Sequence, residues 1–148
     1  MRRLAPLFVV LAAMAGCNRG GSGSDGAVSQ AENGLALSVS FDEPLRTGKA
    51  VTWTLNVENR RQEAVTLRFS SGKEGDVALR SGDREVYRWS ANRVFSQALR
   101  EVQVAARATH SVRLEESGMT VAPGEYDLVA EVAADPAPGV LHRPVTIR

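Results

Sequence analysis

The stretch Val51-Thr52-Trp53-Thr54-Leu55-Asn56-Val57-Glu58-Asn59 decides the fold class of this chain. Large apolar residues alternate with polar ones along most of it. Successive side chains of a strand point to opposite faces of its sheet. The alternation therefore predicts a β-strand with one buried face and one face in water.

The same period of two recurs along the chain on both sides of this stretch. It predicts strands at residues 35–41, 51–59, 65–69, 77–79, 85–89, 99–104, 111–114, 125–132 and 145–148. Residues 91–98 are the best candidate for a helix, of one or two turns. About eight or nine short strands in a single domain predict an all-β fold, an Ig-like antiparallel two-sheet sandwich.

The beginning of the chain has the features of an export signal. Met1-Arg2-Arg3 is positively charged, and residues 4–15 are uncharged and mostly apolar. This run is shorter than the ~20 residues that a helix needs to span a bilayer. Residues 1–16 are therefore predicted to be a signal peptide.

The apolar run ends in Met14-Ala15-Gly16-Cys17, which resembles the lipobox of bacterial lipoproteins. The resemblance implies that Cys17, the only cysteine, is lipidated and becomes the new N-terminus. The alternative is an ordinary cleaved signal followed by an incidental cysteine. Lipidation would place the protein outside the cytoplasm, anchored to the bacterial cell membrane or outer membrane.

Residues 17–33 are predicted to form a flexible tether, because a segment rich in glycine and serine buries too little apolar surface to become ordered. Residues 34–148 are then the folded domain, which is long enough to form a core without disulfides. The whole chain has 18 Lys+Arg and 17 Asp+Glu, and removing the signal peptide removes two arginines and no acid. Such a near-neutral domain has no electrostatic footprint for nucleic acid.

The sequence lacks the patterns that catalysis and metal binding require. Nucleophilic catalysis needs a nucleophile beside a base that a third group orients. His110 is expected at an exposed strand start, and His142 lies in the C-terminal segment. Neither histidine neighbours a serine in a catalytic motif such as Gly-x-Ser-x-Gly. No group of His, Cys or carboxylates has the spacing of metal ligands. We therefore expect no enzymatic activity, no cofactor and no metal site.

A second informative stretch, Tyr87-Arg88-Trp89-Ser90-Ala91-Asn92-Arg93-Val94-Phe95-Ser96-Gln97, joins a predicted strand to a crossing segment. Three further stretches accompany it in order, namely residues 51–59, residues 65–72 and Pro123-Gly124-Glu125-Tyr126. Together they make the run from residue 51 to residue 132 resemble a BsuPI domain, the family of intracellular proteinase inhibitors.

The resemblance implies a monomeric inhibitor that binds a subtilisin-type serine protease stoichiometrically, through a loop or an edge strand. The partner would be a protease or another envelope protein. The competing hypothesis is a non-inhibitory Ig-like envelope module that docks another protein or polymer through a sheet face.

The residues of the family box have structural interpretations. Trp89 is expected to fill the centre of the sandwich, with its N–H bonded to a carbonyl; the alternative is an exposed interface anchor. Phe95 is expected to plug the core, and Ser90 and Gln97 to satisfy backbone groups of the crossing. Tyr126 follows a Pro-Gly turn and is expected to form a tyrosine corner, with its hydroxyl bonded to upstream backbone.

Three loops could contact a protease, at residues 70–76, 105–109 and 116–123. The third is of most interest, because Gly118-Met119-Thr120 places an apolar side chain in a polar turn braced by Pro123. An apolar cleft accepts such a side chain. The alternative is that Met119 folds back as a lid over the end of the core.

Overall fold

The computed structural model describes residues 27–148, and all regular structure in that part of the chain is β-strand. The strands are β1 (Val28–Gln30), β2 (Leu35–Ser40), β3 (Val51–Asn59), β4 (Val65–Phe69), β5 (Gly75–Ser81), β6 (Arg84–Arg88), β7 (Arg100–Val104), β8 (Thr109–Glu116), β9 (Gly124–Val132), β10 (Ala134–Asp135) and β11 (Val140–Ile147). The predicted signal peptide, Cys17 and most of the predicted tether lie outside the described residues. No helix long and apolar enough to span a membrane occurs in residues 27–148.

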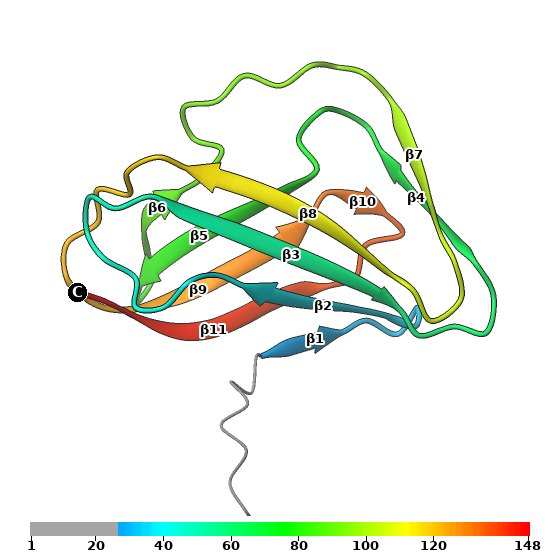
Figure 1. Cartoon of the computed structure of the whole chain (residues 1–148), viewed down its shortest axis with the longest axis horizontal. Coiled ribbons are helices and arrows are strands. Elements are labelled where there is room, and N and C mark those ends of the chain that lie inside the picture. Colours follow the sequence, from blue (N-terminus) through cyan, green and yellow to red (C-terminus); the bar gives the residue numbers. More distant parts are fainter. Residues whose placement is uncertain (1–26) are drawn as a thin grey trace, which may run out of the picture.

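The strands form three antiparallel sheets, with orders β1-β2-β3-β8, β11-β9-β5-β6 and β10-β4-β7. Figure 1 shows β2, β3 and β8 crossing over β5, β9 and β11, with β4 and β7 extending beyond one end of this sandwich. The all-β sandwich prediction is confirmed. The structure has eleven strands in three sheets, rather than eight or nine in two. The strands that were not predicted are β1 and β10, and the third sheet arises because β4, β7 and β10 pair separately from the larger sheets.

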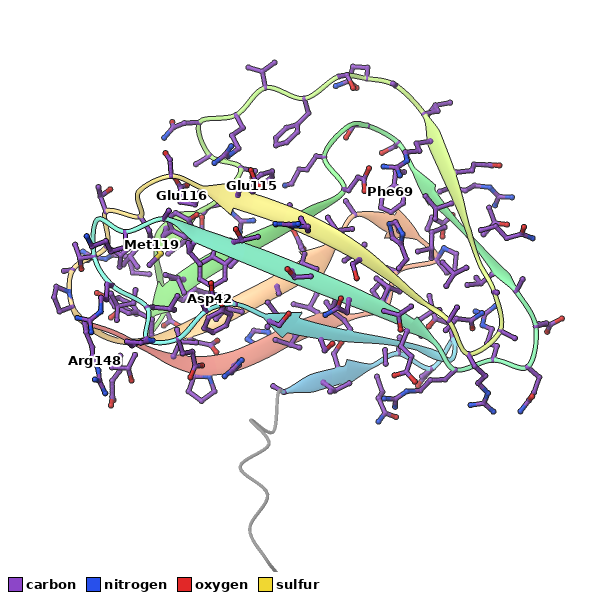
Figure 2. All side chains as sticks on the ribbon, in the orientation of Figure 1. Asp42, Phe69, Glu115, Glu116, Met119 and Arg148 are labelled. Carbon is purple, nitrogen blue, oxygen red and sulfur yellow. The ribbon has the colours of Figure 1, made fainter. Side chains whose placement is uncertain are left out.

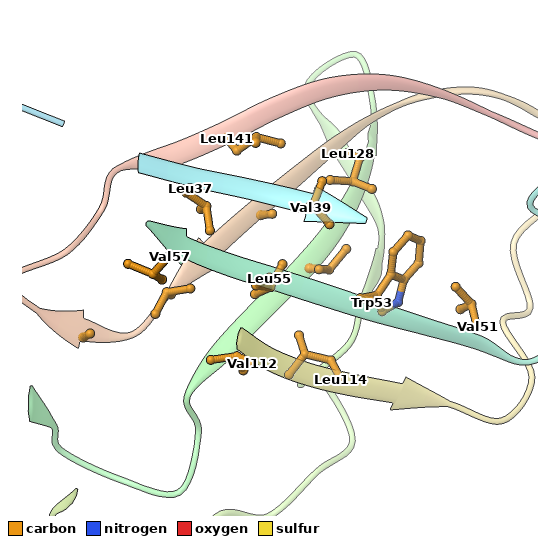
Figure 3. Close-up of a cluster of buried hydrophobic side chains, with 14 of the residues drawn as sticks. Leu37, Val39, Val51, Trp53, Leu55, Val57, Val112, Leu114, Leu128 and Leu141 are labelled. Carbon is orange, nitrogen blue, oxygen red and sulfur yellow. The ribbon is translucent and has the colours of Figure 1, made fainter. Parts of the chain in front are cut away.

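The alternation along β3 positions the core. Every second residue of β3 is buried, and Trp53, its third residue, is 0% exposed. The ring of Phe41 packs edge-on against Trp53, with 5.0 Å between the centroids. Figure 3 shows the surrounding leucine and valine side chains from both large sheets. The centre of the sandwich is therefore occupied by Trp53, whereas the sequence analysis assigned Trp89 to it.

The folded domain begins earlier than the predicted boundary at residue 34. Val28–Gln30 pairs with β2 as an edge strand, inside the predicted tether. The side chains of Ser29 and Asn33 donate hydrogen bonds to the carbonyls of Pro138 and Ala137, at 3.2 and 2.8 Å. Backbone pairing to an open sheet edge does not require apolar side chains, so composition alone missed this strand.

The helix predicted at residues 91–98 is wrong. A turn follows β6, with hydrogen bonds from the Ala91 amide to the Arg88 carbonyl and from the Arg93 amide to the Ser90 carbonyl, both at 3.2 Å. The chain then runs without regular structure to β7. Side-chain bonds to neighbouring elements, described below, hold this conformation in place of helical hydrogen bonds.

Candidate functional site

Residues 89–99, which we call the crossing, form the longest connection between strands in the described part of the chain. The crossing leaves β6, at the edge of one large sheet, and enters β7 in the small sheet. Figure 1 shows it as an arch standing away from the sheets. Long connections of this kind often carry function in compact domains.

Asp76 of β5 anchors the start of the crossing. This carboxylate is 1% exposed, and a buried charge is stable only with partners. Its Oδ1 accepts a hydrogen bond from the Ser90 amide at 3.1 Å, and its Oδ2 accepts one from the Ser90 hydroxyl at 2.5 Å. The Lys73 ammonium and the Arg88 guanidinium also contact Oδ2, at 2.7 and 3.0 Å. The carboxylate thus joins the crossing to a core strand.

The pKa of Asp76 depends on both its burial and its hydrogen-bond partners. Burial by itself would raise the pKa, but the hydrogen bonds from Lys73, Ser90 and Arg88 outweigh it. The net result is a pKa below the ordinary value of 3.8. Asp76 is therefore ionised at neutral pH and accepts hydrogen bonds through both oxygens. Ser90 was expected to satisfy backbone groups of the crossing. Its hydroxyl bonds the Asp76 carboxylate instead.

Trp89 forms the second anchor. Its ring is half-buried at the margin of the core, and its Nε1 donates a hydrogen bond to the Glu115 carbonyl at 3.0 Å. The Arg93 guanidinium lies over the ring, 4.4 Å from its centroid, and the Phe95 ring lies on it at 5.7 Å. Phe95 is only half-buried, so it packs on Trp89 and does not plug the core. The expected N–H to carbonyl bond of Trp89 is confirmed.

Arg93 reinforces this anchor through its polar atoms. Its Nε donates to the Trp89 carbonyl at 2.9 Å, and its Nη2 donates to the Glu115 carbonyl at 2.8 Å. The Glu116 carboxylate lies 3.5 Å from Nη2. Glu115 and Glu116 are at the end of β8, beside the foot of the crossing (Figure 2). A single arginine therefore ties the crossing to the neighbouring large sheet.

Gly72 provides the third anchor, in the loop between β4 and β5. Its amide donates a hydrogen bond to the Ser96 carbonyl at 2.8 Å. A Cβ at Gly72 would lie 2.8 Å from the Ser96 Oγ and 3.4 Å from the Ser96 amide nitrogen, so a larger residue there would force the Ser96 side chain to move. Gln97 is exposed, and within residues 27–148 its side chain makes no hydrogen bond, contrary to expectation. The backbone contact is made by Ser96.

The crossing also exposes apolar side chains. Four large apolar residues of the described chain are exposed, and two of them, Val94 and Leu99, belong to the crossing. Val94 is 100% exposed, although its neighbours Arg93 and Phe95 both pack on Trp89. Val94 was not among the site residues predicted from the sequence. The available signal was an apolar residue in a segment without strand periodicity.

Met119 is not available to a partner. It is 1% exposed and belongs to the hydrophobic core, and Figure 2 shows it among the side chains at the end of the sandwich. Its backbone exchanges hydrogen bonds with the turn at Gly48 and Lys49, at 2.8 and 3.2 Å. The loop Gly118-Met119-Thr120 therefore cannot present the Met119 side chain to a protease, and this part of the prediction is wrong. The flexible thioether fills the end of the core, as the lid alternative proposed.

The other predicted residues lie away from the crossing. The Tyr126 hydroxyl donates to the Ala122 carbonyl at 2.8 Å, the upstream backbone bond expected of a tyrosine corner. His142 is exposed and its Nδ1 lies 2.9 Å from Asp127 Oδ2. His110 was expected at an exposed position but is half-buried against Phe69, and burial lowers its pKa. Residues 27–148 contain no group of three or more His, Cys, Asp or Glu placed to hold a metal ion.

The fold and the crossing define a small all-β sandwich domain that presents one long anchored loop. The family model for BsuPI, described as intracellular proteinase inhibitor, matches residues 38–137 of the chain. This protein belongs to the BsuPI family, as the sequence resemblance implied. No curated protein sequence matches the chain.

Several solved structures are distantly similar. A beta-glucosidase from Listeria innocua in complex with glucose is 15% identical, with 76% of this chain and 16% of that chain covered and a TM-score of 0.41. The Pseudomonas fluorescens alkylpurine DNA glycosylase AlkC, bound to DNA containing an abasic site analog, is 12% identical over 74% of this chain and 29% of that one, with a TM-score of 0.41. The b-glucosidase EmGH1 from Erythrobacter marinus is 17% identical over 76% and 16%, with a TM-score of 0.37. The chain spans under a third of the length of each of these proteins.

Proposed function

We propose that this protein inhibits a subtilisin-type serine protease by stoichiometric binding, and that the crossing is the segment that enters the protease cleft. Membership of a proteinase-inhibitor family supports the first part. The three anchors at Ser90, Trp89 and Ser96 support the second, because they hold a protruding loop in one conformation. This anchoring is the observation that carries the proposal.

Preorganisation is what an inhibitory loop needs. Binding costs conformational entropy for every segment that becomes ordered, so a loop that is already ordered binds more tightly. A protease cleft also recognises extended backbone through main-chain hydrogen bonds. Within residues 27–148, the backbone amides and carbonyls of Val94 and Phe95 make no hydrogen bond to other protein groups. They are free to pair with an enzyme.

The compartment of the target protease follows from where the chain is held in the cell. We propose that the chain is exported and anchored by lipid at Cys17, so its protease lies outside the cytoplasm, although the family is described as intracellular. The basis is the Met14-Ala15-Gly16-Cys17 sequence after an apolar run. A domain held on a membrane in this way would act on proteases of the cell envelope.

Titration of proteases with the purified protein tests this function. The chain is added in increasing amounts to subtilisin-like and other serine proteases of known active-site concentration, and hydrolysis of a peptide substrate is followed. We expect activity to fall linearly to an end point near one inhibitor per enzyme. Gel analysis of the mixture distinguishes an inhibitor from a competing substrate, because an inhibitor stays intact. No slowing at high molar excess across several enzymes favours the envelope docking module instead.

A further inference from the structure

We infer that Val94 is the specificity-determining residue of the inhibitor, and that the target protease has an apolar specificity pocket sized for a β-branched aliphatic side chain. This inference rests on the proposed function and deepens it. It assigns to the target a class of pocket that the family description does not state.

The direction of Val94 follows from its two neighbours. In an extended chain, consecutive side chains point to opposite sides. Arg93 and Phe95 both turn back onto the Trp89 ring, at 4.4 and 5.7 Å from its centroid. The Val94 side chain between them is 100% exposed, so it points away from the domain. Trp89 therefore acts as the platform that aims Val94 outward.

Val94 also lies between fixed points of the backbone. On one side, the Arg93 amide closes a turn on the Ser90 carbonyl at 3.2 Å. On the other side, the Ser96 carbonyl accepts the Gly72 amide at 2.8 Å. Two residues with free backbone groups remain between them, and the first carries the exposed side chain. A projecting side chain on a short, held, unpaired backbone is the form in which a specificity residue is offered to a cleft.

The chemistry of valine selects the pocket. Its side chain is uncharged and stiff at χ1, so it loses little rotamer freedom on burial and gains from losing contact with water. The guanidinium of Arg93, the preceding residue, lies over the Trp89 ring and beside the Glu116 carboxylate. A pocket that selects lysine or arginine would bury its own carboxylate without a partner, which is unfavourable. An aliphatic pocket has no charge that would be buried without a partner when Val94 enters it.

Inhibition constants for Val94 variants test the inference. The full-length chain is assayed against three serine proteases with pockets for small aliphatic, aromatic and basic residues. We expect the wild type to inhibit the aliphatic-selective enzyme most strongly. V94D should raise its inhibition constant by about 100-fold or more, since it places an unpaired charge in an apolar pocket, whereas V94I should stay near the wild type. V94R should shift inhibition toward the enzyme with the basic-residue pocket.

Val140 provides the matched control, because it is an exposed valine on β11, outside the crossing. V140D should leave inhibition unchanged, and urea unfolding should show that every variant is folded. Wild-type inhibition that V94D and V94R leave unaltered overturns the inference while the proposed function stands. Preference of the wild type for the basic-residue or aromatic pocket also overturns it. A wild type that inhibits none of the enzymes overturns the proposed function, and this inference with it.

Discussion

The carboxylate of Asp76 holds Ser90 through two hydrogen bonds, one to the amide at 3.1 Å and one to the hydroxyl at 2.5 Å. Asp76 is a buried residue of a core strand, and Ser90 begins an exposed loop. A charge in the interior therefore fixes a conformation at the surface. Stability of the core and rigidity of the loop should consequently change together.

Replacing Asp76 by asparagine should weaken both properties. D76N leaves Lys73 and Arg88 without their shared carboxylate, and breaking a buried ion pair costs about 3–5 kcal/mol. Both cations are partly exposed, with side-chain exposures of 30% and 36%, which reduces this cost. We therefore expect a loss of about 2–4 kcal/mol in urea unfolding.

The control for D76N is E101Q. Glu101 pairs with Arg68 in a salt bridge whose two side chains are each 64% exposed, so its loss should change the free energy of unfolding by less than about 1 kcal/mol. Amide exchange at residues 90–93 should accelerate in D76N and not in E101Q. Equal stability of the two variants would show that Asp76 is no anchor.

The lowered pKa of Asp76 predicts a pH dependence of stability. The unfolded carboxylate binds a proton near its ordinary pKa of 3.8, whereas the folded one stays ionised to a lower pH. Between these pKa values the unfolded state binds more protons, so the free energy of unfolding rises with pH in that window. The contribution of Asp76 is present above 3.8 and is lost as the pH falls through the folded pKa.

Urea unfolding at a series of acidic pH values measures this effect. The wild type should lose stability as the pH falls below about 4, and D76N should lose less over the same range because it lacks this titrating group. Parallel profiles for the two proteins would mean that Asp76 has an ordinary pKa in the folded state.

The two tryptophans should respond differently to replacement by alanine. Trp53 is 0% exposed, and W53A should destabilise the domain by about 3–5 kcal/mol, as for other buried aromatics. Trp89 is half-buried, so W89A should cost less in unfolding free energy, but it removes the platform for Arg93 and Phe95 and should weaken inhibition. If W89A proved the more destabilising variant, Trp89 would be the central core residue.

Cys17 is expected to hold the protein on a membrane. Expression of C17S in the native cell should move the protein from the membrane fraction to a soluble one, because the sulfur that would carry the lipid is absent. Metabolic labelling with a radioactive fatty acid should mark the wild type only. An unlabelled wild type, or a C17S protein that fractionates like it, would exclude this anchor.

The sequence predicted the core well because alternation is a local signal. Trp53 belongs to a nine-residue strand whose regular alternation identified the buried face. Trp89 follows the end of a strand, where no alternation fixes its direction. Met119 is surrounded by polar neighbours in sequence, yet the fold brings the end of the core to it. The local sequence around Trp89 and Met119 therefore did not predict how deeply each side chain is buried.

The anchors of the crossing depend on contacts between segments far apart in sequence. Ser90 meets Asp76 because β6 pairs with β5, and Ser96 meets Gly72 because β7 pairs with β4. A carboxylate within the apolar stretch Gly75-Asp76-Val77-Ala78-Leu79 was a signal that could have been used. A charged residue next to a run of apolar strand residues indicates a buried partner.

Hydrogen–deuterium exchange of the full-length chain, alone and with a serine protease that it inhibits, tests the central claim most directly. The backbone amides of Val94 and Phe95, without protein hydrogen bonds in the free chain, should exchange quickly and become protected in the complex. The buried turn at Met119 should be unaffected. Protection confined to another loop, such as residues 105–109, or to a sheet face, with none at residues 93–96, would contradict the account.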